Sequence, residues 1–112
     1  MTQIDSNIKR GSAELAVLTL LSQATMHGYE IAQRIERQTG GLLTFDLASL
    51  YPLLYRLEKR GWLKCAWETA ASGRKRRYYR ITAVGRKQLA PLRNQWRLFF
   101  VALNRLAGVR SA

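Results

Sequence analysis

Apolar residues recur with a helical period in two segments near the N-terminus. Residues 12–24 are rich in Ala and Leu and apolar around most of the circumference, which predicts a largely buried first helix beginning at a Ser12 cap. Residues 29–38 place apolar side chains on one face and charged or polar ones on the other, and Gly40 and Gly41 follow. This second pattern predicts a short amphipathic helix that ends at the two glycines.

A third helix is predicted from Asp46, a good N-terminal cap, to about Arg60. Its core-facing leucines follow the spacing i, i+3, i+4 and i+7, at Leu50, Leu53, Leu54 and Leu57. Pro52 removes a backbone donor just past the first turn if Asp46 is the cap, so we expect the helix to bend or to begin later, at a Ser49 cap. The face turned away from the core carries Ala48, Ser49, Pro52, Tyr55, Arg56 and Lys59.

After Gly61 the period changes from helical to alternating. Residues 62–69 alternate apolar and polar side chains, and residues 77–82 alternate again after a loop at 70–76. The two runs predict a β-hairpin whose loop contains a glycine and a cluster of cations.

The last predicted helix begins at a Thr82 cap and carries apolar residues at alternating spacings of three and four. The stripe consists of Leu89, Leu92, Trp96, Phe99, Leu103 and Leu106. Spacing of this kind is typical of a helix that pairs with another helix, so we expect the stripe to form a dimer interface. Pro91 lies within it and should kink the helix or mark the start of a second one.

Charge is strongly segregated along the chain. Residues 69–112 contain eleven Arg and Lys and no Asp or Glu, whereas residues 1–68 hold eight basic and seven acidic residues. Nearly all of the net charge of +12 therefore lies in the C-terminal part. A chain of 112 residues with this charge and 47% hydrophobic residues indicates one folded domain with a polyanionic partner.

Other classes of function are disfavoured by composition. The single His27 and single Cys65 provide neither a metal-ligand spacing nor a nucleophile–base pair, so we expect no metal, no cofactor and no catalysis. His27 is interpreted as a structural hydrogen-bonding residue and Cys65 as a small apolar packing residue. No apolar run is long enough to cross a bilayer and no signal peptide is recognisable, so a cytoplasmic location is expected.

The predicted order, three helices, a hairpin and a long helix, is that of a winged helix-turn-helix plus a C-terminal dimerisation helix, a mainly α fold with a small β-hairpin. We assign residues 1–85 to DNA binding and residues 86–112 to dimerisation. The third helix would enter a major groove, and the hairpin tip would meet backbone phosphates. The DNA-binding residues predicted from this arrangement are Ser49, Tyr55, Arg56, Lys59, Arg74, Lys75 and Arg76.

Three motifs carry a resemblance to a known family. They are His27-Gly28-Tyr29-Glu30-Ile31, the segment from Ser49 to Glu58 (SLYPLLYRLE) followed by Gly61, and the segment from Gly73 to Thr82 (GRKRRYYRIT) with Gly85. In this order and spacing, over roughly residues 11–90, the chain resembles the PadR-like transcriptional regulators. Its length is similar to that of the shorter members, which have one C-terminal dimerisation helix.

The resemblance implies a dimeric winged-helix repressor that binds an inverted-repeat operator in double-stranded DNA and is released by a small molecule. By matching position, Ser49, Tyr51 and the next helical turn would face DNA, and Gly73 to Arg76 would form the wing tip. In members that respond to flat aromatic compounds, a tryptophan of the last helix lines a pocket at the dimer interface. Trp96 matches that position, and with Phe100 it would bind a small aromatic effector.

Several alternatives remain open at this level. Tyr51 is assigned equally to the core and to DNA contact, and of the neighbouring Tyr78 and Tyr79 at most one faces a ligand, because adjacent strand residues point to opposite faces. Arg56 and Lys59 either contact DNA or only pair with Glu58 or solvent. A non-specific architectural or RNA-binding protein has the same charge. Binding to a membrane surface through the last helix is disfavoured by its narrow apolar stripe, so no membrane partner is expected.

Overall fold

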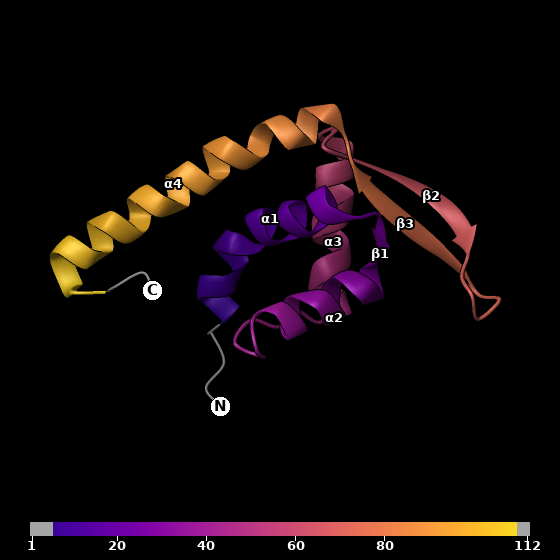
Figure 1. Ribbon diagram of the computed structural model, residues 1–112, viewed down its shortest axis with the longest axis horizontal. Coiled ribbons are helices and arrows are strands. Elements are labelled where there is room, and N and C mark those ends of the chain that lie inside the picture. The colour runs from indigo at the N-terminus through magenta and orange to yellow at the C-terminus, as the bar shows by residue number, and fades with distance from the viewer. Residues whose placement is uncertain (1–5, 110–112) are drawn as a thin grey trace.

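The computed structural model describes residues 6–109, with side chains from residue 11 onward. The elements are α1 (Ser6–Gln23), β1 (Met26–His27), α2 (Gly28–Gln38), α3 (Leu47–Lys59), β2 (Leu63–Thr69), β3 (Lys75–Ile81) and α4 (Ala83–Ala107). The first three helices pack together, the β2–β3 hairpin projects from one side of them, and α4 extends away on the other side (Figure 1). The fold is a winged helix-turn-helix followed by a C-terminal helix, as predicted.

Helix starts differ from prediction in two places. The first helix begins at Ser6, not at Ser12, because the six residues before Ser12 include no proline to break it. The third helix begins at Leu47, so the late start at a Ser49 cap is wrong. Its cap is Asp46, whose Oδ1 accepts a hydrogen bond from the Ser49 N–H at 2.7 Å. Helix α3 continues through Pro52, at the loss of one backbone donor.

The last helix begins at the predicted cap. Thr82 Oγ1 accepts a hydrogen bond from the Gly85 N–H at 3.0 Å, and the same hydroxyl donates to the Gly61 carbonyl at 2.6 Å. Helix α4 runs without interruption through Pro91, so no second helix begins there. Gly85 is buried where α4 passes the wing, and a Cβ at this position would collide with the carbonyl oxygen of Trp62. The start of α4 is therefore in direct contact with Trp62, the residue that precedes β2.

The sheet has three antiparallel strands in the order β1-β3-β2. Strand β1 was not predicted, because two residues are too few to show alternation, and it pairs Met26 with Tyr79 and His27 with Tyr78. Strand β3 begins at Lys75, two residues earlier than expected, because Lys75 pairs with Thr69 and Arg76 with Glu68. The additional pairs shorten the loop and place both cations on the strand.

The core lies between the first three helices and the inner face of the sheet. Helix α3 contributes the four predicted leucines, all at most 4% exposed. The other buried apolar residues are Ala13, Val17, Leu18, Leu20 and Leu21 of α1, Met26, Ile31 and Ile35, and Leu63, Tyr79 and Ile81 of the sheet. Leu89 and Leu92 of α4 pack against this core from outside. The outer face of α3 and the hairpin tip are left in solvent.

Candidate nucleic-acid interface

The solvent face of α3 is the one expected from the leucine stripe. Ala48, Ser49, Pro52, Tyr55, Arg56 and Lys59 are all exposed. Within the described residues, Arg56 and Lys59 form no ion pair, because Glu58 binds a wing residue instead. The face thus combines a hydroxyl, an aromatic ring and two unpaired cations, the side-chain types that read base edges and contact phosphates.

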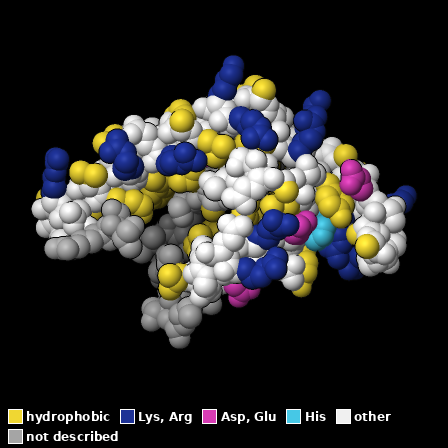
Figure 2. Space-filling view, viewed as in Figure 1, with side chains coloured by type: hydrophobic (Ala, Val, Ile, Leu, Met, Phe, Trp, Pro, Cys, Tyr) yellow, Lys and Arg dark blue, Asp and Glu magenta, His cyan; other side chains and the backbone are white. Residues whose placement is uncertain are grey.

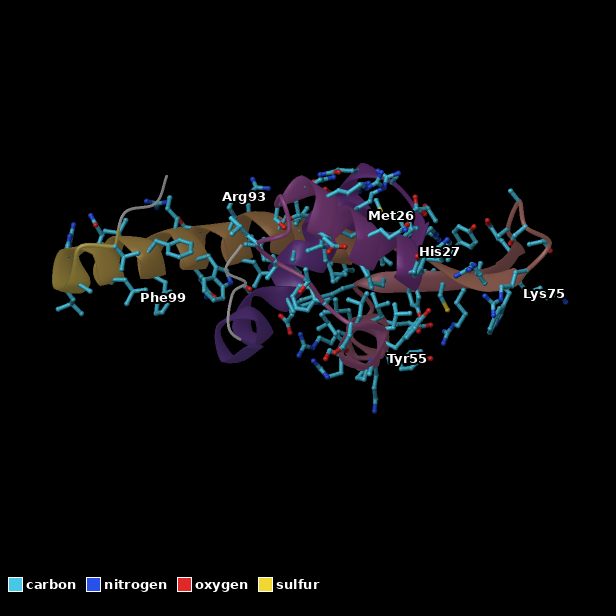
Figure 3. All side chains as sticks on the ribbon, turned by 90° about the horizontal axis from the view of Figure 1, so that it is seen from below. Met26, His27, Tyr55, Lys75, Arg93 and Phe99 are labelled. Atoms are coloured by element: carbon cyan, nitrogen blue, oxygen red, sulfur yellow. The ribbon has the colours of Figure 1, made fainter. Side chains whose placement is uncertain are left out.

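The wing tip is a tight turn. The Ala70 N–H donates to the Arg74 carbonyl at 2.8 Å, and the Gly73 N–H donates to the Ala70 carbonyl at 2.9 Å. Gly73 has a φ of 85°, a backbone conformation that favours glycine. The turn exposes Arg74 and Lys75, which form no ion pair with any described residue. Figure 3 shows Lys75 at the far end of the hairpin.

A groove of about 370 Å³ separates α3 from the wing. It brings together five of the predicted DNA-binding residues, Tyr51, Tyr55, Arg74, Lys75 and Arg76. Ser49, Arg56 and Lys59 lie on α3 outside its lining. Three further residues line the groove and were absent from the predicted set: His27, Trp67 and Arg77. Four consecutive cations, 74–77, therefore line one groove together with aromatic side chains, and such a surface is suited to bind a polyanion.

Arg77 differs from its neighbours because it is bound internally. Its guanidinium donates to Glu58 Oε1 of α3 at 3.0 Å and to the Sγ of Cys65. It also lies 5.1 Å from the ring centroid of Tyr55. The hydrogen bond to Cys65 is the largest cause that raises the pKa of Arg77, so the charge is permanent. Arg77 thus holds the wing against α3, and Arg74 and Lys75 remain the cations free to bind a partner.

Cys65 is a polar packing residue in place of the purely apolar one expected. It is half-buried, and its thiol donates a hydrogen bond to Glu58 Oε2 at 3.0 Å. Glu58 lies at the end of α3 and Cys65 lies seven residues later, in β2. Because the two residues belong to different elements, no helical or strand periodicity indicated this contact.

Tyr51 belongs both to the core edge and to the groove. Its ring is partly buried and lies so close to Gly28 that a Cβ there would be 2.8 Å from Tyr51 Cε1. The same ring stacks on Tyr55 at a centroid distance of 6.4 Å. Gly28 belongs to the motif at residues 27–31 and Tyr51 to the motif at residues 49–58. The missing side chain of Gly28 leaves room for the Tyr51 ring, so the two motifs are linked by packing.

His27 has a structural role, as interpreted. Its Nδ1 accepts a hydrogen bond from the Glu30 N–H at 3.2 Å and so caps α2, and its ring meets Tyr78 edge-on at 5.2 Å. Burial, followed by the charge of Arg76, lowers the pKa of His27. Within the described residues, no group of three or more His, Cys, Asp or Glu is placed to hold a metal ion.

The two neighbouring tyrosines of β3 point to opposite faces, as predicted. Tyr79 is fully buried, and Tyr78 is half-exposed on the outer face of the sheet. Burial raises the pKa of Tyr79 to about 12.

The predicted stripe on α4 divides into two parts. Leu89 and Leu92 pack against the core of the chain, whereas Phe99 and Leu106 are 50% and 87% exposed. Trp96 lies between them, half-buried beside Gly11 of α1, and Leu103 is half-buried further along. In Figure 2 hydrophobic side chains and Lys and Arg side chains alternate along the visible face of α4.

The outer part of α4 carries an aromatic cluster. The ring of Trp96 lies 5.5 Å from that of Phe99 and 6.1 Å from that of Phe100, centroid to centroid. Arg93 and Arg97 are exposed beside it, and Arg97 donates to Asn94 Oδ1 at 2.7 Å. Both predicted effector-binding residues, Trp96 and Phe100, are therefore in this cluster.

The three-helix core, the basic wing and the exposed α3 face together define a winged-helix DNA-binding regulator. The family model described as "Transcriptional regulator PadR-like family" matches residues 17–91. The chain therefore belongs to the PadR-like family of transcriptional regulators.

Solved structures agree with this assignment. A transcriptional regulator from Clostridium thermocellum superposes with a TM-score of 0.83 and 32% identity, covering 93% of this chain and 98% of that one. A PadR-like transcriptional regulator from Bacillus cereus gives a TM-score of 0.77 and 28% identity, with 94% and 100% covered. An uncharacterised protein from Lysinibacillus sphaericus is 34% identical over 93 residues, 83% of this chain and 85% of that protein.

Among the described residues, none of the helices combines the length and hydropathy needed to cross a bilayer.

Proposed function

We propose that the protein is a homodimeric, sequence-specific repressor that binds an inverted-repeat operator and is released by a small aromatic effector. The observation that carries the proposal is the groove between α3 and the wing, which is lined by four consecutive cations of the wing and by Tyr51 and Tyr55 of α3, the proposed recognition helix. Such a regulator would act on DNA in the cytoplasm.

The roles of the two elements follow from their chemistry. Helix α3 would enter the major groove, with Ser49, Tyr55 and Arg56 towards base edges and Lys59 towards the backbone. The wing tip, Arg74 and Lys75, would bind phosphates beside it and fix the position of α3 without reading sequence. Residues 1–85 would thus bind DNA, and residues 86–112 would hold two copies together.

The dimer proposal is supported by the apolar surface of α4. Five large apolar side chains of its C-terminal half are more than a third exposed: Leu98, Phe99, Phe100, Val101 and Leu106. A patch of this kind on a small chain marks an interface with another protein surface. A second copy is favoured because two-fold symmetry would place two recognition helices about 34 Å apart, in successive major grooves.

The effector proposal is supported by the Trp96, Phe99 and Phe100 cluster. Flat aromatic ligands stack on such rings, and the exposed Arg93 and Arg97 would favour a neutral or anionic ligand over a cation. Release from DNA requires that the ligand bind better to a dimer geometry in which the recognition helices do not fit the operator.

Selection of bound duplexes from a random DNA pool, at two salt concentrations, tests the proposal. An inverted-repeat consensus with half-sites one helical turn apart is expected. Between 50 and 200 mM salt the affinity should fall on the order of 10³- to 10⁵-fold if the dimer neutralises six to ten phosphates. Recovery of unselected DNA alone, or equal binding to double-stranded RNA, would instead identify a non-specific architectural or RNA-binding protein.

A further inference from the structure

Trp67 is the most exposed aromatic side chain of the described wing, at 66%. Most large aromatic side chains in a small domain bury much of their surface, so an indole left in solvent on a projecting strand indicates a partner that covers it. Exposure alone does not identify the partner, but the direction and surroundings of Trp67 do.

The side chain of Trp67 faces α3. Alternation along β2 places Trp67 on the same face as Leu63, which is buried, and Cys65, whose thiol binds Glu58 of α3. Its register partner across the hairpin is Arg77, which also binds Glu58. Trp67 therefore continues the inner face of the sheet beyond the part that α3 covers, and it lies over the groove.

The groove around Trp67 combines two kinds of surface. Its opposite wall carries the rings of Tyr51 and Tyr55, and its outer end carries Arg74 and Lys75, which have no acidic partner in the described chain. A DNA strand presents the same combination, because apolar deoxyribose faces alternate with anionic phosphates along the backbone. The indole offers a flat apolar surface and one N–H donor, which matches a sugar and its adjacent phosphate oxygen.

We propose that Trp67 is a DNA-contact residue, which packs against a deoxyribose of the backbone strand that crosses the groove between α3 and the wing. This inference rests on the proposed DNA-binding function and adds to it a specific contact. Trp67 contributes affinity and not base readout, because sugars are the same at every position. The indole is uncharged and neutralises no phosphate, so its contribution to the affinity should not depend on the salt concentration.

The experiment measures DNA affinity of the full-length chain at four salt concentrations for the wild type, Trp67→Ala, Trp67→Thr and Lys75→Ala. Both variants lack the indole, but Thr has a higher strand propensity than Ala. A loss of affinity that is shared by both variants is therefore due to the missing indole and not to a weakened strand. Trp62→Phe, which changes an indole outside the groove, is the control for a general effect of altering a tryptophan. Thermal unfolding of each variant shows whether it is folded.

Both Trp67 variants should bind roughly fivefold or more weakly at every salt concentration, as expected when an aromatic ring no longer packs on the nucleic acid. The slope of log affinity against log salt should remain that of the wild type. Lys75→Ala should instead reduce the slope by about 0.9 for each phosphate that is no longer neutralised. Wild-type affinity in a folded Trp67 variant overturns the inference and leaves the proposed function intact, whereas a wild type that binds no DNA overturns both.

Discussion

Arg77 of the wing donates a hydrogen bond to Glu58 of the recognition helix at 3.0 Å, and this ion pair joins the two elements proposed to bind DNA. The side chains are 24% and 31% exposed, so solvent screens the pair only in part. The pair fixes the width of the groove in which Tyr55 and Trp67 lie. Glu58 is the only carboxylate of α3, and because it binds Arg77, Arg56 and Lys59 of the same helix remain unpaired.

The first prediction concerns this pair. Replacing Glu58 by Gln should lower the free energy of unfolding by about 1 kcal/mol, because a charge-assisted hydrogen bond is removed while the thiol of Cys65 keeps an acceptor. Urea denaturation of Glu58→Gln, Arg77→Gln and the double variant gives the coupling energy. The helical pair Glu30–Arg34 is the control, with about 0.3–0.5 kcal/mol expected. A coupling energy of Glu58–Arg77 below that of the control would show that the pair does not fix the wing.

The second prediction compares two helical glycines. Gly28→Ala should destabilise the fold by about 1–3 kcal/mol, because the new Cβ would lie 2.8 Å from the Tyr51 ring and displace it. Gly11→Ala should stabilise it by roughly 0.5–1 kcal/mol, because its Cβ would meet Trp96 at an ordinary 3.6 Å and the helix gains from Ala. Combining Gly28→Ala with Tyr51→Ala tests the cause, since the smaller side chain leaves room for the Cβ. Equal effects of the two glycine substitutions would contradict the proposed packing.

The third prediction follows from the lowered pKa of His27. In the unfolded chain the group has its usual pKa of 6.5. The folded state therefore binds fewer protons just below that pH, and stability falls as the pH drops through 6.5 towards the lower pKa of the folded state. Protonation also removes the acceptor that caps α2, an interaction worth about 1 kcal/mol. His27→Ser keeps a capping oxygen that does not titrate, so its unfolding free energy should be the less pH-dependent. Parallel pH profiles of the two proteins would show that His27 is not the titrating group.

The fourth prediction concerns the buried Tyr79, whose hydroxyl has no hydrogen-bond partner within the described residues. Tyr79→Phe should leave stability at pH 7 unchanged or raise it by about 1 kcal/mol, because an unsatisfied polar group is removed. The pKa of Tyr79 is raised from 10.0 to about 12, so the folded state retains a proton that the unfolded chain has lost. Wild-type stability should therefore decline between pH 10 and 12, by roughly 1 kcal/mol per pH unit, relative to Tyr79→Phe. A constant difference between the two proteins across this range would contradict the assignment.

The fifth prediction tests the proposed dimer face. Phe99→Glu places a charge in the exposed aromatic surface of α4 and should convert the dimer into a monomer in sedimentation velocity. Val84→Glu, an exposed position at the opposite end of the same helix, should leave the assembly unchanged. Because Phe99 lies outside the core of its own protomer, the monomer should remain folded. A dimer that persists in Phe99→Glu at micromolar concentration would place the interface elsewhere.

Features set by local sequence were predictable. The caps at Asp46 and Thr82 and the leucine face of α3 depend on residues within one or two turns, and each was confirmed. Strand β1 was not predicted, because its only support is pairing with β3, about fifty residues further along the chain.

The candidate site was predicted incompletely for the same reason. The cations of the wing tip stand out in the sequence, but the Glu58–Arg77 pair joins residues nineteen positions apart across a turn and a strand. The alternation predicted for residues 62–69 puts Trp67 on the apolar face of the hairpin. That interpretation was correct for its direction, but it could not show that α3 ends before covering it.

The contact between Gly85 and the Trp62 carbonyl has a mechanical consequence. It clamps the first turn of α4 to the base of the wing, and α4 then extends for 25 residues away from that point. A helix of this length measures about 37 Å, so a rotation of about 5° at the clamp moves its far end by about 3 Å. Conversely, if two α4 helices pair and a ligand binds beside Trp96 as proposed, a shift of a few ångströms between the helices would reorient each recognition helix by only a few degrees. In the proposed dimer, helix α4 would therefore act as a lever that converts a movement of a few ångströms beside Trp96 into a rotation of a few degrees at the recognition helix, α3.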